Sequence, residues 1–334
     1  MIERTAGEAD EPVIEPDLEI TDAHHHFFPP GEHDWPGLLD YSLDHWLADT
    51  GAGHRVTSSV WVEARGGFPR WSPLDEVNAI TEIARESERR GGAVVRALVG
   101  DADLRQSDVG DVLDQLHEAS EGRLSGIRHA SLWDASPDIA TYPSKPGEGL
   151  LRRPEFLTGF GELARRDMTF DAWMYHPQLL DLAPLADAFP ETRIIVDHLG
   201  GPTKLGPYGA DRDATLSVWR RHMSELSKRT NVFVKLGGIG LMDFADPVDV
   251  TGDADVEPTS EQLANYWRNE LRWLIETFGV NRCMFESNFP IDNPMCSYVV
   301  LWNAFKRIVA DASPEEKRAL FAGTANRVYG IKGQ

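Results

Sequence analysis

Short apolar runs alternate with longer amphipathic segments along most of the chain. Eight runs rich in Val, Ile, Leu and Phe each end in small or polar residues. They span residues 18–23, 57–64, 93–100, 125–130, 169–175, 192–200, 231–238 and 282–290. Between residues 74 and 92, Val77, Ile80 and Ala84 recur on one helical stripe, opposite charged residues. The pattern therefore predicts strands that alternate with helices.

Strands that alternate with helices form parallel sheets, and eight such units predict a single-domain (β/α)8 TIM barrel of the α/β class over residues 18–331. The alternative is an open doubly wound sheet, which normally has a glycine-rich loop after its first strand. Residues 1–17 are acidic and are predicted to be a disordered tail. Residues 132–149 and 242–260 lack a helical period and are predicted to be loops on the C-terminal face of the barrel.

Charge and cysteine content narrow the classes of partner. The formal net charge of -21 argues against nucleic-acid binding, since a phosphate backbone is held by Lys and Arg. Cys283 and Cys296 are the two cysteines, too few for a disulfide framework, and no apolar run approaches a signal peptide or a membrane span. We expect a cytoplasmic protein that acts on a small molecule without a membrane partner. A homodimer is expected only because symmetric dimers are common.

Three consecutive histidines follow the first predicted strand. Side chains alternate along a strand, so His24 and His26 share one face while His25 takes the other. At the mouth of a barrel, the two imidazoles on the shared face can bind one divalent metal ion, such as zinc or manganese. The alternative is that these histidines lie on the surface or pack in the core.

Polar and ionisable residues also stand at the same end of nearly every other predicted strand. They are Glu63, Arg128, His176, Asp197, His198, Lys235, Glu286 and Asn288. Because an active site in a barrel is assembled from the carboxyl ends of several strands, we expect these side chains to lie close together.

Seven segments resemble one known family in their order and spacing. They are TDAHHHFF, GIRH, YHPQL, VDHLGGP, VFVKLGG, MFESNFP and LFAGTANRVYG. The chain is similar to the amidohydrolase superfamily, in the branch that contains 2-pyrone-4,6-dicarboxylate lactonase, L-fucono- and L-rhamnono-lactonases and, more distantly, aminocarboxymuconate-semialdehyde decarboxylase. The resemblance implies a metal or catalytic cluster made of His24, His26, His176 and His198.

The chain departs from this branch at the end of the eighth strand. Asn288 stands where the resemblance implies an aspartate, and an amide is neither a useful base nor an anionic ligand. Glu286, on the same face and one layer deeper, and Glu63 are the candidate general bases; the alternative for each is a buried partner of a histidine or of Lys235. The branch also contains hydrolases without a tightly bound metal, so both metal-dependent and metal-free activity are considered.

A guanidinium group and several aromatic rings are expected on the substrate side. Arg128 suits a substrate carboxylate bound by two hydrogen bonds, and the alternative is a salt bridge with Glu63 or Glu286. The expected substrate contacts are Arg128, His176, Trp61, Phe28 and Tyr175, with Trp133 and Trp173 as further aromatic candidates.

These features predict a hydrolase of a lactone or related cyclic ester, derived from a carboxylated ring compound. The histidine cluster would activate water, with His198, Glu286, Asn288, Glu63 and Lys235 as the catalytic set, and His176 and Lys235 would polarise the carbonyl. One alternative is a metal-dependent decarboxylase or hydratase that acts on an aromatic-derived acid. Another is a catalytically inactive barrel that binds a small molecule, suggested by Asn288.

Overall fold

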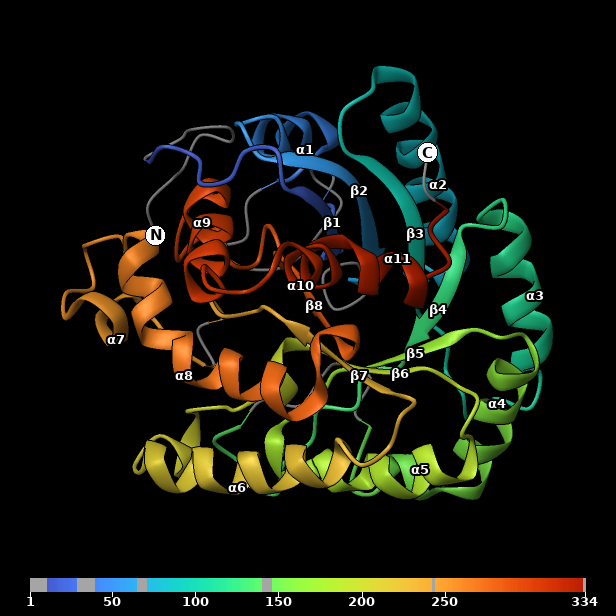
Figure 1. Ribbon diagram of the computed structural model, residues 1–334. Coiled ribbons are helices and arrows are strands. Elements are labelled where there is room, and N and C mark those ends of the chain that lie inside the picture. The colour runs from blue at the N-terminus through green and yellow to red at the C-terminus, as the bar shows by residue number, and fades with distance from the viewer. Residues whose placement is uncertain (1–10, 29–39, 65–70, 140–145, 242–243, 333–334) are drawn as a thin grey trace.

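The computed structural model describes residues 11–28, 40–64, 71–139, 146–241 and 244–332. Over these residues, eight parallel strands form a nearly closed barrel surrounded by helices, which confirms the predicted (β/α)8 fold (Figure 1). The strands are β1 Glu19–His25, β2 Arg55–Val62, β3 Val94–Gly100, β4 Leu124–Arg128, β5 Thr169–Ala172, β6 Ile194–Val196, β7 Val232–Leu236 and β8 Cys283–Phe285. Each strand overlaps one of the predicted apolar runs.

The strands pair in chain order, and the ring closes between the residues that follow β8 and the end of β1. The backbone N–H of Asn288 donates to the His24 carbonyl oxygen at 2.8 Å, and that of His26 donates to the Phe289 carbonyl oxygen at 2.8 Å. The closure therefore brings the segment after β8 directly beside His24 and His26.

Helices cover the outside of the barrel (Figure 1). They are α1 Leu43–Thr50, α2 Pro73–Arg90, α3 Val109–Ala119, α4 Pro154–Arg165, α5 Leu182–Ala188, α6 Arg212–Leu226, α7 Pro247–Thr251, α8 Ser260–Phe278, α9 Tyr298–Ile308, α10 Pro314–Arg318 and α11 Thr324–Val328. The predicted stripe of Val77, Ile80 and Ala84 is buried on α2. That helix begins where Ser72 accepts a hydrogen bond from the Asp75 N–H, so both the stripe and the cap were encoded locally.

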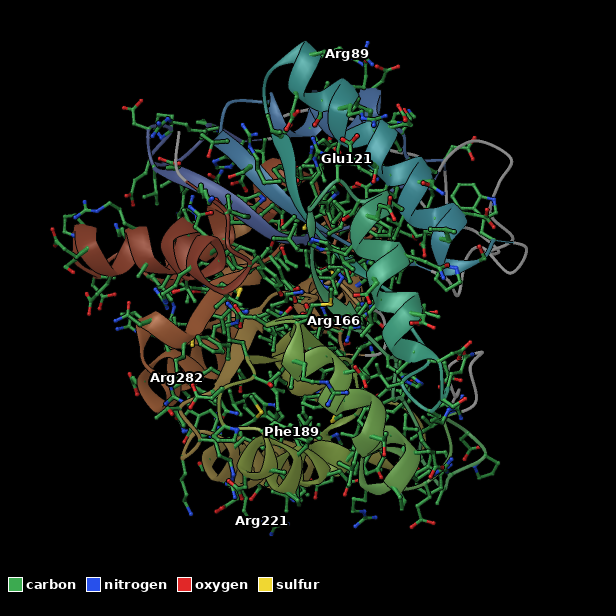
Figure 2. All side chains as sticks on the ribbon, turned by 90° about the vertical axis from the view of Figure 1, so that its right-hand side faces the viewer. Arg89, Glu121, Arg166, Phe189, Arg221 and Arg282 are labelled. Atoms are coloured by element: carbon green, nitrogen blue, oxygen red, sulfur yellow. The ribbon has the colours of Figure 1, made fainter. Side chains whose placement is uncertain are left out.

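Two layers of apolar side chains hold the fold together. The larger layer fills the space between strands and helices, where side chains pack densely (Figure 2). The smaller one lies among Val60, Val62, Val99 and Ile195, and the C-terminal Tyr329 packs into it. This end of the chain therefore packs against the same strands that carry the candidate site.

One of the two predicted loops contains a short helix. In the predicted loop 242–260, of which residues 242–243 lie outside the described residues, α7 begins with a capping box between Asp246 and Asp249. Its five residues are too few to show a helical period in the sequence. Residues 140–145 of the other predicted loop also lie outside the described residues.

The predicted disordered tail is only partly described. Residues 1–10 lie outside the described residues. After them, the Ile14 N–H donates to Asn303 Oδ1 at 2.8 Å, and Glu11 accepts a hydrogen bond from the Ser260 N–H at 2.8 Å. Residues 11–14 are thus held against α8 and α9.

In the described part of the chain, no helix combines the length and the apolar character needed to cross a membrane.

Candidate active site

The first strand carries a register shift just before its histidines. The shift lies between Asp22 and His25, and Asp22 Oδ1 accepts hydrogen bonds from the N–H groups of His24 at 3.2 Å and Ser287 at 2.9 Å. Asp22 therefore fixes the end of β1 against the segment that follows β8.

The two faces of the histidine run are separated as predicted. His25 turns toward the helices, where its ring stacks on Trp46 at 4.0 Å and its Nε2 lies 2.9 Å from Ser59 Oγ. His24 and His26 point the other way, and their Nε2 atoms are 3.2 Å apart. The strand thus presents two imidazoles to one point at the mouth.

The hydrogen-bond partners of His26 and His198 fix which ring nitrogen carries the proton. His26 Nδ1 lies 2.9 Å from the Val62 carbonyl oxygen, which can only accept, so Nδ1 donates. His198 Nδ1 lies 2.8 Å from Glu286 Oε1 and likewise donates to the carboxylate. Burial lowers the pKa of His26 well below its usual value, so its Nε2 keeps a lone pair at neutral pH.

His24 lies at the centre of the group. Its Nδ1 is 2.9 Å from Glu286 Oε2 and 3.1 Å from Lys235 Nζ. Burial, together with the nearby Lys235 charge, lowers the pKa of His24 well below its usual value. The imidazole is therefore neutral and can act as a ligand.

Glu286, a candidate base, lies beneath the histidines and is fully buried. Besides its contacts with the rings of His24 and His198, its Oε1 accepts the His198 backbone N–H at 3.2 Å. Oε1 thus orients the His198 imidazole, as carboxylates beside metal-binding histidines commonly do, while Oε2 faces His24 Nδ1 without a hydrogen bond of good geometry. Its role as the general base stays a prediction.

Asp197 joins the group although the sequence interpretation gave it no role. It is fully buried, with Oδ1 3.0 Å from Lys235 Nζ and Oδ2 3.6 Å from Arg128 Nη1. Neither oxygen has a hydrogen bond of good geometry to any described residue. Burial alone would raise the pKa of Asp197, but Lys235, His198 and Arg128 together lower it, so the carboxylate is ionised. Its position at the end of a predicted strand was the available signal.

His24, Asp197 and His198 can converge on one cation. Their ligand atoms all lie within 4.8 Å of one another. His176, predicted as a fourth ligand, does not belong to this group. It begins the 3-10 helix His176–Asp181, its ring packs 4.8 Å from that of Tyr208, and burial lowers its pKa to about 4. Its roles as ligand and substrate contact stay predictions.

A left-handed turn presents His198 to the mouth. His198 and Leu199 have φ values of 49° and 59°, which are uncommon for residues other than glycine. The Trp219 indole N–H donates to the Leu199 carbonyl oxygen at 2.6 Å and holds the turn. A Cβ atom on Gly238 would meet the His198 ring at 2.7 Å, so a glycine is required beside it.

Arg128 contacts Glu63, and this salt bridge was the alternative prediction for Arg128. Its Nε donates to Glu63 Oε1 at 2.6 Å, and its Nη2 donates to the Glu63 carbonyl oxygen. The guanidinium lies 5.0 Å from the ring centroid of Trp173, and the side chain is only 3% exposed. The roles of Arg128 in substrate binding and of Glu63 as a base stay predictions.

Lys235 lies in the barrel interior between two aspartates. Its Nζ donates to Asp171 Oδ2 at 2.7 Å and forms an ion pair with Asp197, and the Tyr329 hydroxyl also donates to Asp171 Oδ2 at 2.7 Å. The predicted polarisation of a substrate carbonyl by Lys235 would compete with these contacts.

The interior cluster carries more negative than positive charge. Two cations, Arg128 and Lys235, lie among four carboxylates, which belong to Glu63, Asp171, Asp197 and Glu286. All of these side chains are buried. The set therefore holds two more carboxylates than cations.

The predicted aromatic contacts are divided between the core and the mouth. Trp61 shares the outer face of β2 with Ser59 and is fully buried in the core between strands and helices, so the expectation that it lines the mouth is corrected. Phe28 packs beside His26, with ring centroids 5.9 Å apart, and Tyr175 is buried. Half-buried Trp173 lies at the mouth, with its ring centroid 6.1 Å from that of His198.

Asn288 is paired with an acid that the sequence interpretation missed. Its Nδ2 donates to Asp292 Oδ1 at 2.8 Å, and the Gly240 N–H donates to Asp292 Oδ2 at 2.8 Å. Burial raises the pKa of Asp292 to about 7. Asp292 follows β8 by several residues without any strand pattern, so no sequence signal marked it.

Comparisons with known proteins agree with this geometry. A family model described as amidohydrolase matches residues 21–331. The chain is 30% identical over 331 residues to the protein y4mH of Sinorhizobium fredii, and the aligned region covers 94% of this chain and 99% of that protein. It is 27% identical over 321 residues to the L-fucono-1,5-lactonase of Burkholderia multivorans, and that aligned region covers 93% of this chain and 95% of the lactonase. An amidohydrolase structure from Burkholderia multivorans with bound zinc has a TM-score of 0.70 at 24% identity, over 94% and 99% of the two chains. The chain therefore belongs to the amidohydrolase family and is a hydrolase-type enzyme.

Proposed function

We propose that the protein hydrolyses a lactone or a related cyclic ester to the open hydroxy acid. The observation that carries the proposal is a buried group of imidazoles, of which His24 and His26 are neutral, around an ionised Asp197 whose oxygens make no hydrogen bond of good geometry within the described residues. The chain's similarity to an L-fucono-1,5-lactonase supports ester-ring hydrolysis as the reaction.

The residues fit a divalent metal ion. Neutral imidazole nitrogens and an ionised carboxylate are the ligands that zinc prefers, and the excess of two carboxylates over cations in the cluster matches the charge of one divalent ion. His24, Asp197 and His198 would hold the ion, with His26 beside His24 as a further ligand. A bound ion would supply electrostatic stabilisation of the negative charge that develops on the lactone carbonyl oxygen. A relative of similar fold contains zinc.

The chain's own groups can also handle the proton. When a water oxygen bonds to the lactone carbonyl carbon, the water gives up a proton, and an Asp197 oxygen is placed to accept it. The bond between the carbonyl carbon and the ring oxygen then breaks, and the same proton passes to the ring oxygen. The product is a hydroxy acid.

The contacts of Arg128 favour a substrate without a carboxylate. A guanidinium that donates to Glu63 and lies against Trp173 would have to leave both partners to bind a carboxylate. We therefore expect neutral sugar-type lactones to react faster than carboxylated ring lactones. This expectation differs from the carboxylated substrate that the sequence predicted.

A paired lactone panel tests the proposed function. Sugar lactones and carboxylated pyrone-type lactones would be followed by proton release and by NMR of the products, with carbon dioxide measured in parallel. Ring opening of at least one lactone is expected. Carbon dioxide release or hydration of an aromatic acid, without ring opening, would contradict the proposal.

The role of Asp197 is tested by a pair of matched substitutions. Asp197→Asn keeps the size of the side chain but removes the charge, and we expect kcat/KM to fall by about 100-fold or more. Asp213→Asn, at an exposed position on α6, removes the same charge from the surface and should leave kcat/KM unchanged. Equal activity of the two variants would remove Asp197 from the mechanism.

A further inference from the structure

A carboxylate outside the histidine group holds the side-chain amide of Asn288. Asp292 is fully buried, and among the described residues its oxygens contact the Asn288 amide and the Gly240 N–H rather than a cation. Because an ionised carboxylate only accepts hydrogen bonds, it fixes the Asn288 side chain with Nδ2 toward Asp292.

The other end of the amide is then free to accept a hydrogen bond. Asn288 is 1% exposed, and its Oδ1 has no hydrogen-bond partner among the described residues. The backbone of Asn288 is held to the His24 carbonyl oxygen by its N–H at 2.8 Å. The unpartnered oxygen therefore belongs to a residue that is anchored beside the histidines of β1.

The loop after β7 fixes Asp292 from the opposite side. A Cβ atom on Gly240 would meet both Cβ and Cγ of Asp292 at 3.0 Å, so only glycine lets this N–H approach the carboxylate closely. The Gly240 N–H thus requires one of the two terminal side-chain atoms at position 292 to be an oxygen that accepts its hydrogen bond. The second terminal atom, an acceptor oxygen in Asp292, determines which end of the Asn288 amide faces it.

We infer that Asp292 is a positioning residue that aims the Asn288 amide oxygen at the attacking water, an inference that rests on the proposed hydrolysis. Water is a hydrogen-bond donor that every hydrolysis brings to the site, whatever the substrate, and the Asn288 oxygen is an acceptor for it. Asp292 acts through Asn288 and does not itself touch the reacting atoms.

A charge-swap series tests this assignment at pH 8, where Asp292 is mostly ionised. In Asp292→Asn, Gly240 takes the new amide oxygen, so the new NH2 group faces Asn288 and turns the Asn288 oxygen away from the water. In Asn288→Asp, two carboxylates oppose each other. We expect each single variant to lose about tenfold or more in kcat with little change in KM.

The double variant Asn288→Asp with Asp292→Asn should recover most of the lost kcat. The new NH2 group at position 292 then donates to the new carboxylate at position 288, whose second oxygen again faces the water. Asn293→Asp is the matched control, because it adds a charge to the same loop outside the pair, and it should leave kcat unchanged.

Two outcomes would overturn the inference: additive losses in the double variant, or losses confined to KM. The free energy of unfolding should follow the same cycle, with both single variants less stable than the double variant, and this part is measurable without turnover. A wild-type protein that opens no lactone would instead refute the proposed function. In that case a non-additive stability cycle would support only the pairing of Asn288 with Asp292, and an additive cycle would refute the pairing as well.

Discussion

At the scale of single residues, the site is organised by what holds the Nδ1 atoms of its histidines. Val62 accepts from His26, and Glu286 lies within hydrogen-bonding distance of Nδ1 of both His24 and His198. Fixing one ring nitrogen sets the orientation of the other, so the Nε2 atoms are aligned before a ligand arrives. Glu286 thus holds the His198 ring through Oε1 and places its other carboxylate oxygen beside His24.

Substitution Glu286→Gln tests this arrangement. The amide oxygen can still accept the His198 Nδ1 hydrogen, but the substitution removes the negative charge and turns an NH2 group toward His24 Nδ1, so we expect zinc affinity to fall by about 10–100-fold. Competition with a chelator measures the affinity, and exposed Glu191→Gln is the control. Unchanged affinity in both variants would mean that Glu286 does not orient the ligands.

The sequence predicted part of this residue-level arrangement. Alternation along β1 separated His24 and His26 from His25, and strand ends marked His198 and Glu286. Asp197 was seen but received no role, and the partner of Asn288 was missed, because hydrogen bonds between distant loops leave no local pattern. Trp61 was misplaced because its strand position does not tell a mouth-facing tryptophan from one that packs under the helices.

At the scale of elements, the site depends on two glycine-containing turns that meet. The turn after β6 places His198 in a left-handed conformation, and Gly238, in the loop after β7 with φ 65°, lies against the His198 ring. Both turns follow short strands of the barrel, so the strands set the distance between them.

Gly238→Ala should therefore disturb both stability and catalysis. The new Cβ would meet the His198 ring at 2.7 Å in addition to the left-handed backbone penalty of about 1 kcal/mol. Gly252→Ala separates these effects, because Gly252 has φ 83° with nothing within 4 Å. Urea unfolding should show a larger loss of stability for Gly238→Ala than for Gly252→Ala. The value of kcat/KM should fall in Gly238→Ala and stay unchanged in Gly252→Ala. Similar behaviour of the two variants would exclude the clash.

The elements themselves were largely predictable. Eight buried strands and an amphipathic α2 carry patterns that depend on local periodicity, and these are the elements that the sequence predicted. The short α7 depends on a capping box rather than on a period, so the pattern favoured a loop there. Contacts of residues 11–14 with α8 and α9 join distant parts of the chain, which no local pattern records.

At the scale of the whole molecule, several histidines are buried without charge, and this couples stability to pH. His129 lies between the barrel and the helices, accepts the Leu104 N–H at 3.3 Å, and has its pKa lowered to about 4 by burial. The unfolded chain takes up a proton at this position first as the pH falls. The contribution of His129 to the free energy of unfolding is therefore complete above the pKa that histidine has in the unfolded chain. It is lost as the pH falls from there toward 4.

His129→Gln tests this linkage, since glutamine can still accept the Leu104 N–H but does not titrate. All other titratable groups are the same in the two proteins, so their effects cancel in the difference between the two free energies of unfolding. The advantage of the wild type in unfolding free energy should shrink by about 2 kcal/mol between pH 7.5 and pH 5. Urea unfolding at the two pH values measures it, and a constant difference would show that His129 does not titrate as described.

Lactone hydrolysis is proposed to depend on one cation bound by His24, Asp197 and His198 at the mouth of the barrel. The most direct measurement is the rate of lactone ring opening as chelator-treated protein is titrated with zinc, with bound zinc counted by elemental mass spectrometry. The account predicts a rate that rises with added zinc and levels off at one equivalent, and that stays low throughout in Asp197→Asn. Full ring-opening activity in the zinc-free protein, unchanged by titration, would contradict it.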